Sequence, residues 1–327
     1  MNVPASDGRP APDALQAWAS QVRAGDVRAL ARAITAIENQ QPQAEALLEQ
    51  LFPVTGKAFL IGVTGAPGTG KSTLVDRLAA KYRVLGRTVG IIAVDPTSPY
   101  SGGAVLGDRI RMQGHSGDAG VFIRSMATRG FLGGLSRAAA DAALLLDAAG
   151  REIVILETVG VGQDEVDIVR LADCTLVLMV PGLGDDVQSM KAGLMEVADI
   201  FVLNKAERDG ADRLQQQIEA MLELAPDRGG WKTPVVRTTA TEGAGVAQLV
   251  ETIEAFRTRA EPAVDRRDRA VLRWKQRLRR LLAEQLLDGI LERSGGEAAL
   301  ETLAGAVAER RVNPYTAVRE MATRAGI

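Results

Sequence analysis

The feature that most constrains this chain is the run of residues 65–72, which reads GAPGTGKS. An apolar run at residues 59–63 comes directly before it, and apolar residues at helical spacing follow from residue 74. This order predicts a strand, a phosphate-binding loop and a helix, because glycines let main-chain N–H groups turn inward around a phosphate. Lys71 would supply a positive charge to the terminal phosphates, and the Ser72 hydroxyl would ligate Mg2+. The sequence therefore predicts a nucleoside triphosphate as the ligand.

A flexible glycine turn would satisfy the same pattern, so the surrounding sequence has to decide between the two interpretations. A buried strand before the loop, an amphipathic helix after it and further nucleotide-binding elements downstream favour the phosphate-binding loop. The residues expected to line it are Gly65, Ala66, Pro67, Gly68, Thr69, Gly70, Lys71, Ser72 and Thr73.

Composition narrows the class of protein further. The 327 residues can bury a substantial core, and the net charge of -2 offers no basic surface for nucleic acid or for an anionic membrane. No apolar stretch reaches the roughly 18 residues of a membrane-spanning helix, and the N-terminus lacks a secretory signal. We therefore expect a cytoplasmic protein with neither nucleic acid nor a membrane as partner.

The chain has one cysteine and one histidine. Cys174 has apolar neighbours and is expected to be a buried strand residue without a disulfide. His115 is expected to be a polar residue in a mobile loop, and a catalytic base is the alternative. A dedicated transition-metal site is disfavoured, because these two residues lie far apart in the sequence.

Strand and helix patterns alternate through the middle of the chain, which predicts an α/β fold. The expected architecture is a P-loop NTPase with a mostly parallel sheet covered by helices on both faces and with ligands at the carboxyl ends of the strands. Helical patterns flank it, with a break at residues 25–26 in the first flank and a helix at 310–324 in the second. The predicted parts are an N-terminal helical extension (1–55), a nucleotide-binding domain (56–260) and a C-terminal helical segment (261–327), which is either an extra layer on the same chain or a dimerisation arm.

Several polar residues follow the predicted strands. Asp95 ends the second strand and Asp108 lies in the glycine-rich loop after it, where each could contact Mg2+ directly or through water, or simply cap a turn. Glu157 ends a later strand and could hold Mg2+ through water, while the Gly160 amide could sense the γ-phosphate. Gln163 is the chain's own candidate for orienting the attacking water, and a group from a partner is the alternative.

Residues 204–207 follow the apolar strand at 200–203 and read NKAE, which resembles the guanine-reading Asn-Lys-x-Asp element of GTPases. Asn204 and Lys205 match it. Glu207 keeps the pair of acceptor oxygens that guanine N1–H and its amino group require, but it adds a methylene. Thr239 and Ala240, after the last strand, would place a main-chain amide near guanine O6.

Taken together, these segments resemble the MeaB/ArgK-type GTPases, the accessory G-proteins of adenosylcobalamin-dependent acyl-CoA mutases. The resemblance rests on the phosphate loop and on residues 93–98, 102–109, 156–163 and 181–188, and it covers about residues 10–325. It implies a Mg2+-dependent GTPase that binds GTP and GDP, forms a homodimer and serves as a chaperone that gates cofactor loading onto the mutase and protects it.

The resemblance also assigns residue roles. Residues 181–191 match a third switch segment that couples nucleotide state to the mutase, although a plain strand-to-helix connection would have the same composition. Ser72, Asp95, Asp108 and Glu157 fall on metal positions, and Asn204, Lys205 and Glu207 fall on the base-recognition motif. The residues expected to act in catalysis are Lys71, Asp95, Asp108, Glu157, Gly160 and Gln163.

Two other functions remain open at this point. A protein or small-molecule kinase would agree with the older label of ArgK relatives, but the sequence shows no separate domain for an acceptor substrate. A nickel-delivery GTPase would share the fold class, but such proteins carry Cys and His ligands. No recognisable segment of the sequence identifies the particular acyl-CoA mutase.

Overall fold

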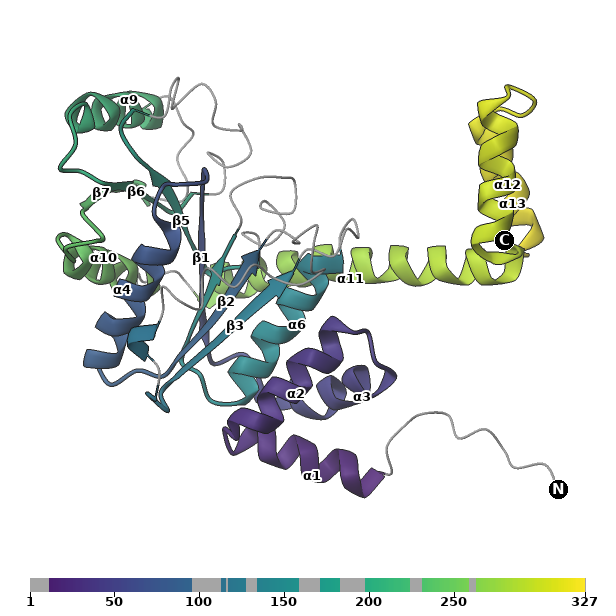
Figure 1. Cartoon of the computed structure of the whole chain (residues 1–327), viewed down its shortest axis with the longest axis horizontal. Coiled ribbons are helices and arrows are strands. Elements are labelled where there is room, and N and C mark those ends of the chain that lie inside the picture. Colours follow the sequence, from purple (N-terminus) through teal and green to yellow (C-terminus); the bar gives the residue numbers. More distant parts are fainter. Residues whose placement is uncertain are drawn as a thin grey trace. The chain divides into compact units, whose positions relative to one another are not determined.

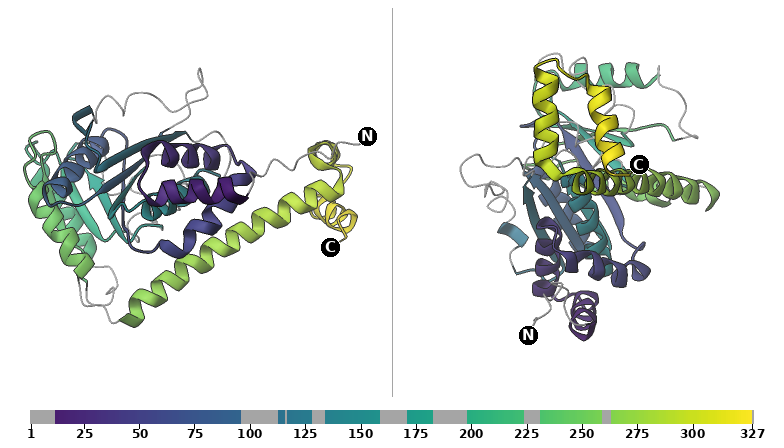
Figure 2. Two further views of the ribbon diagram at one scale, coloured as in Figure 1. Left: turned by 90° about the horizontal axis from the view of Figure 1, so that it is seen from below. Right: turned by 90° about the vertical axis from the view of Figure 1, so that its right-hand side faces the viewer.

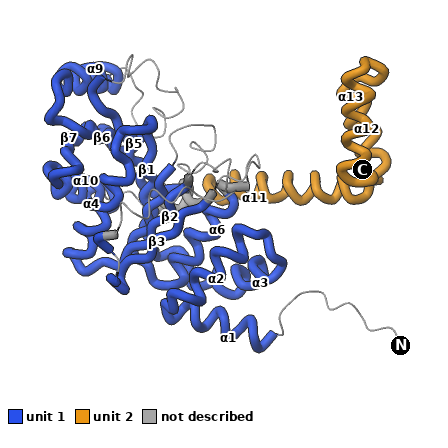
Figure 3. The backbone as a smooth tube through the Cα atoms, in the orientation of Figure 1, with its two compact units in different colours: residues 1–259 blue, residues 260–327 orange. Residues whose placement is uncertain are grey.

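The computed structural model of the chain divides into two compact units, Met1–Arg259 and Ala260–Ile327, which are described separately (Figure 3). The structure describes residues 12–95, 113–115, 117–127, 134–158, 171–182, 198–223, 231–258 and 263–326.

A parallel sheet forms the centre of the first unit. In the described part of the chain it has seven strands in the order β3-β2-β4-β1-β5-β6-β7, and every pairing is parallel (Figure 1). The central strands β1, β4, β5 and β6 are short apolar runs buried on both faces, which is typical of a parallel sheet between two helical layers, whereas the edge strands β3 and β7 are only partly buried. The predicted α/β fold is confirmed. The strands are β1 (Phe59–Gly65), β2 (Val89–Asp95), β3 (Val121–Ala127), β4 (Ile153–Glu157), β5 (Cys174–Met179), β6 (Ile200–Asn204) and β7 (Val235–Thr238).

Alternate residues of each strand enter different hydrophobic cores. In β4, Ile153 and Ile155 pack with residues of α4 and α10, whereas Val154 and Leu156 pack with residues of α6. Helices therefore cover both faces of the sheet (Figure 2). Their bounds are α4 (Lys71–Val84), α6 (Gly134–Ala148), α9 (Ala211–Glu223) and α10 (Val246–Thr258).

The N-terminal helices α1 (Pro12–Arg23), α2 (Val27–Glu38) and α3 (Pro42–Leu51) share the core that contains α6, and the short 3-10 helix η1 (Phe52–Val54) follows them. The predicted break between the first two is confirmed, because Asp26 caps α2 by accepting a hydrogen bond of 2.6 Å from the Ala29 N–H.

Arg124 of β3 forms an ion pair with Glu38 of α2 and donates a 3.1 Å hydrogen bond to the Thr35 hydroxyl. These contacts fasten the N-terminal helices to the edge of the sheet as well as to α6.

The second unit consists of α11 (Ala263–Ser294), α12 (Gly296–Ala308) and α13 (Pro314–Arg324). Leu303, Ala317 and Met321 form its small buried core. The predicted helix at 310–324 was placed too early, because Arg310 has a left-handed backbone with φ of 59° and Asn313 caps α13 through a 2.9 Å bond from the Thr316 N–H.

Cys174 is fully buried at the start of β5, as predicted, and burial raises the pKa of its thiol. In the residues that the structure describes, none of the helices combines the length and the apolar character that crossing a bilayer requires.

The carboxylate of Asp147, in the last turn of α6, organises the segment that leads into β1. It accepts hydrogen bonds from the main-chain N–H groups of Gly56, Lys57 and Ala58, with 3.0 Å to Ala58. Asp147 is only 7% exposed, so water replaces these bonds poorly when the carboxylate is removed.

We expect Asp147→Ala to lower the free energy of unfolding by about 1–3 kcal/mol, because main-chain donors lose their acceptor. Asp147→Asn keeps one acceptor oxygen and should lose less. Urea denaturation of the two variants and the wild type measures the difference. Equal midpoints for all three proteins would show that the carboxylate does not hold this segment.

Candidate nucleotide-binding site

The GAPGTGKS loop lies between the end of β1 and the start of α4, at the carboxyl edge of the sheet. Gly65, Gly68 and Gly70 have φ angles of 145°, 81° and 92°, which residues with a Cβ rarely adopt. A Cβ on Gly65 would also lie 2.4 Å from the Leu178 carbonyl oxygen of neighbouring β5. Glycine is therefore required here, and the loop leads directly into the positive end of the α4 dipole, where an anion is stabilised.

Lys71 and Ser72 are each 7% exposed at the start of α4. The Lys71 ammonium donates to the carbonyl oxygens of Gly65 at 2.8 Å and Ala66 at 3.2 Å, so it lies folded against the phosphate loop. The Ser72 hydroxyl donates a 2.6 Å hydrogen bond to Oε1 of Glu157, which ends β4 and is 4% exposed. Parallel pairing of β1 and β4 brings these side chains together across 85 positions of sequence.

The Ser72 hydroxyl and the Glu157 carboxylate are hard oxygen donors, and this donor set suits Mg2+. Among the residues that the structure describes, no group of three or more His, Cys, Asp or Glu side chains could hold a metal ion. Mg2+ in nucleotide sites usually takes only one or two ligands from the protein and the rest from water and phosphate. The donors present thus fit a nucleotide-bound Mg2+.

Other predicted residues are only partly covered by the structure. Asp95 ends β2 at the same edge of the sheet, but its side chain lies outside the described residues. Asp108, Gly160 and Gln163 lie outside the described residues altogether, as does most of the 181–191 segment. Their roles stay predictions.

Asn204, at the end of β6, connects three parts of the site. Its Nδ2 donates to the Thr69 carbonyl of the phosphate loop at 2.8 Å, and its Oδ1 accepts from the Thr238 hydroxyl at 3.0 Å and from the Ala240 N–H at 3.1 Å. The Ala240 amide that we expected near guanine O6 therefore points to Asn204 in this structure. Asn204 is 2% exposed, so these hydrogen bonds fix the side chain firmly.

Lys205 and Glu207 lie in the turn that follows Asn204 at the end of β6. Lys205 has a left-handed backbone with φ of 55°, and its ammonium donates to the Gly68 carbonyl at 2.8 Å. Oε2 of Glu207 accepts from the Thr239 hydroxyl at 2.8 Å. The pKa of Glu207 is lowered, first by its own main-chain N–H and then by this hydroxyl, so the carboxylate stays ionised and keeps the acceptor character that guanine requires.

One contact in this region had no signal in the sequence. The Arg77 guanidinium of α4 donates to the carbonyl oxygens of Ala240 and Thr241 at 3.1 and 2.9 Å. An arginine on the exposed side of an amphipathic helix looks like a solvated charge, and only the fold reveals what it reaches.

We expected His115 to be a polar residue in a mobile loop, but the structure places it in a short helix against α4. It ends the short 3-10 helix η2 (Gln113–His115), and its Nε2 lies 3.2 Å from a carboxylate oxygen of Asp76 in α4. The side chain is only 8% exposed, because this polar contact holds it against the helix.

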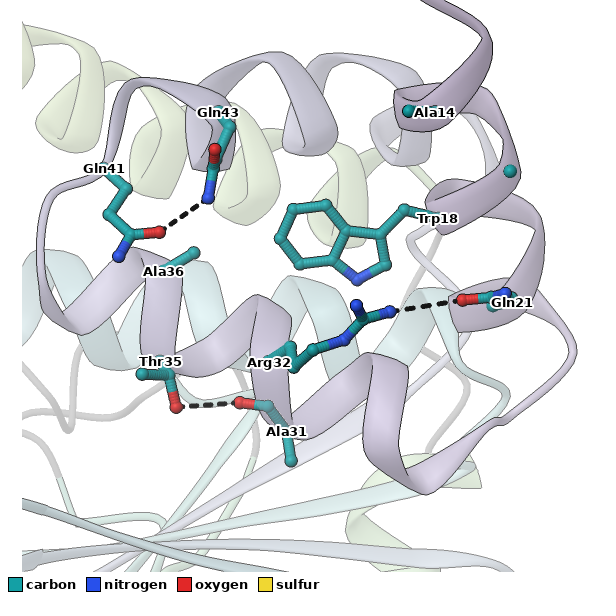
Figure 4. Close-up of a pocket in the computed structure, with 10 residues that line it drawn as sticks. Ala14, Trp18, Gln21, Ala31, Arg32, Thr35, Ala36, Gln41 and Gln43 are labelled. Carbon is teal, nitrogen blue, oxygen red and sulfur yellow. Dashed lines mark hydrogen bonds between the residues drawn. The ribbon is translucent and has the colours of Figure 1, made fainter. Parts of the chain in front are cut away.

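The N-terminal helices enclose a separate open groove of about 760 Å3 (Figure 4). The guanidinium of Arg32 lies 5.5 Å from the centre of the Trp18 ring and donates to Gln21 at 3.3 Å. The groove is lined by residues of α1 and of α2 and by Gln41 and Gln43 at the start of α3. No residue of the phosphate loop or of the proposed base pocket lines it.

The fold and the site together define a P-loop GTPase. The glycine loop precedes a helix, Ser72 is paired with the strand-end carboxylate of Glu157, and the Asn-Lys-x-Glu turn lies against the loop. Comparison with known proteins agrees. A family model described as methylmalonyl Co-A mutase-associated GTPase MeaB matches residues 30–294. The chain therefore belongs to this family and is a GTPase. The resemblance drawn from its sequence is confirmed.

Individual relatives cover most of the chain. A putative GTPase of Pyrococcus abyssi is 46% identical over 300 residues, 91% of this chain and 92% of the relative. The mitochondrial methylmalonic aciduria type A homolog of Mus musculus is 34% identical over 71% of this chain and 60% of its own length. A crystal structure titled LAO/AO transport system kinase covers 97% of this chain and 99% of its own, with a TM-score of 0.72 and 28% identity.

Two glycines of the loop allow a matched test of the contact between loop and base pocket. A Cβ on Gly70 would lie 2.5 Å from Nδ2 of Asn204, whereas a Cβ on Gly68 would have no atom within 4 Å. Both have positive φ, so backbone strain is common to the two substitutions. We expect Gly70→Ala to weaken GDP binding about 10-fold more than Gly68→Ala, equivalent to about 1.4 kcal/mol. Calorimetric titration measures both, and equal losses would contradict the packing of Asn204 against the loop.

Proposed function

We propose that this chain is a Mg2+-dependent GTPase that acts as a chaperone of an adenosylcobalamin-dependent acyl-CoA mutase, gating cofactor loading and protecting the mutase. The observation that carries the proposal is the match of residues 30–294 to a family described as mutase-associated GTPases. The name of the murine relative, which refers to methylmalonic aciduria, supports a connection to methylmalonyl metabolism.

The chemistry follows from the side chains at the carboxyl edge of the sheet. Lys71 lies in the phosphate loop and would exchange its carbonyl partners for phosphate oxygens when GTP binds. Ser72 and Glu157 would hold Mg2+, which neutralises the charge that develops on the phosphate oxygens. Asp95 and Asp108 are proposed to complete this site, and Gln163 or a partner's group to orient the attacking water.

Switching would arise at the edge of this site. Glu157 is fixed against Ser72, so a signal from the γ-phosphate can pass from β4 into residues 158–163. We propose that GTP orders these residues together with residues 95–109 and 181–191, and that hydrolysis releases them. A bound mutase would then distinguish GTP from GDP through differential affinity.

We also propose that the protein is cytoplasmic and that the second unit serves homodimerisation. Leu278, Leu282 and Leu286 of α11 recur at four-residue spacing and are 61%, 57% and 50% exposed. Such an i, i+4 row forms a ridge that can pack into the groove of another helix. A second copy of the same helix would cover it.

Glu207 provides a test of the base pocket. Glu207→Asp retains the ionised acceptor pair and should leave hydrolysis intact, with an equal or sharper preference for GTP over ATP. Glu207→Gln replaces an acceptor oxygen by a donor and should reduce that preference at least about 10-fold. Competition binding with both nucleotides measures the ratio. A strong swing toward ATP in Glu207→Asp would mean that the pocket is misassigned.

The proposed switch is tested by the affinity of the purified chain for acyl-CoA mutases, beginning with any encoded by a neighbouring gene. We expect affinity to differ about 10-fold between GDP and a non-hydrolysable GTP analogue, within the usual range of allosteric coupling. Lys71→Ala should abolish the difference, since it removes the charge that faces the phosphates.

Equal affinity of the mutase for both nucleotide states would contradict the switching proposal.

A kinase is the alternative function. If the chain is a GTPase without a transfer activity, radiolabelled GTP should yield free phosphate. Label recovered on a protein or small-molecule acceptor would instead indicate a kinase.

A further inference from the structure

The loop after β7 is held from two sides. On one side, the Ala240 N–H and the Thr239 hydroxyl contact Asn204 and Glu207, the proposed base-reading side chains. On the other side, the carbonyl oxygens of Ala240 and Thr241 accept hydrogen bonds from Arg77 of α4. The same peptide segment therefore connects α4 with the base pocket.

The loop itself is a tight structure that can transmit this constraint. Thr239 and Ala244 form a β-bridge, and the Gly243 N–H donates to the Ala240 carbonyl at 3.3 Å. Gly245 closes the turn with φ of 74°, and a Cβ there would lie 2.0 Å from the Arg237 carbonyl oxygen. A displacement of Ala240 or Thr241 would therefore move the whole turn, including the groups that contact Asn204 and Glu207.

We propose that Arg77 is a positioning residue for guanine recognition, a role that rests on the proposed base pocket. Its guanidinium fastens the turn at 239–245 to α4, the helix that begins with Lys71. The part of the site that holds phosphates and the part that reads the base thereby keep a fixed separation before the nucleotide arrives. Pre-organisation of this kind raises affinity because less conformational entropy is lost on binding.

The chemistry of arginine suits this role. Two N–H groups of one rigid plane reach two successive carbonyl oxygens, which fixes the orientation of the turn as well as its distance from α4. A lysine at the same place would carry the same charge as a single flexible donor group, so it should not replace arginine.

The experiment compares Arg77→Met and Arg77→Lys with the wild type. For both variants we expect the dissociation constants of GTP and GDP to rise about 10-fold, because neither side chain can hold both carbonyl oxygens in the fixed orientation that the guanidinium gives. Binding of inorganic tripolyphosphate, which has no base, should be unchanged. The kcat at saturating GTP should stay within about twofold, since the hydrogen bonds of Arg77 go to Ala240 and Thr241 and not to the proposed phosphate and metal ligands.

Lys81→Met is the matched control, because Lys81 lies one turn further along α4 and should leave all of these values unchanged. Asn204→Ala serves as the reference for the base pocket itself. If Asn204→Ala weakens GTP binding but Arg77→Met does not, the role of Arg77 is wrong. It is equally wrong if Arg77→Met weakens tripolyphosphate as much as GTP, or if Arg77→Lys binds GTP like the wild type. Unchanged GTP binding by Asn204→Ala would instead overturn the base-pocket assignment on which the role depends.

Discussion

The site depends on the hydrogen bonds of one buried amide, that of Asn204. Its Nδ2 holds the phosphate loop at Thr69, and its Oδ1 holds the end of β7 and the turn beyond it. Because Asn204 uses both its donor and its acceptor and is 2% exposed, the loop and the base pocket have little freedom to move apart. The absence of a side chain at Gly70 makes this approach possible, since a Cβ would lie 2.5 Å from Nδ2 of Asn204.

The parallel sheet explains why so many distant residues meet at this place. Side chains at the carboxyl ends of β1, β4 and β6 come to one edge, and helices on both faces exclude water from the strands beneath. Ser72 and Glu157 are brought together by this arrangement, and so are Lys205 and Gly68. The turn at residues 204–207 contacts the loop through Asn204 and Lys205, and α4 carries both Lys71 and Arg77 along its length.

Much of this could be predicted from the sequence, for a physical reason. The phosphate loop and the Asn-Lys-x-Glu turn are local patterns, and strand-end positions in an α/β fold predict which polar residues share an edge. The contact of Arg77 with Ala240 could not be predicted, because it spans 163 positions and depends on how α4 packs against the turn. The His115 contact with Asp76 and the start of α13 at Pro314 were missed for similar reasons, since each is fixed by a particular polar contact and not by periodicity.

The central claim is that a cradle of main-chain amides and the Lys71 ammonium binds Mg2+-GTP beside a pocket selective for guanine. Calorimetric titration of nucleotide-free protein with GTP and with ATP, each with Mg2+, tests it most directly. The account predicts saturable binding of one GTP per chain and much weaker binding of ATP. No heat with GTP, or equal affinity for the two nucleotides, would contradict it.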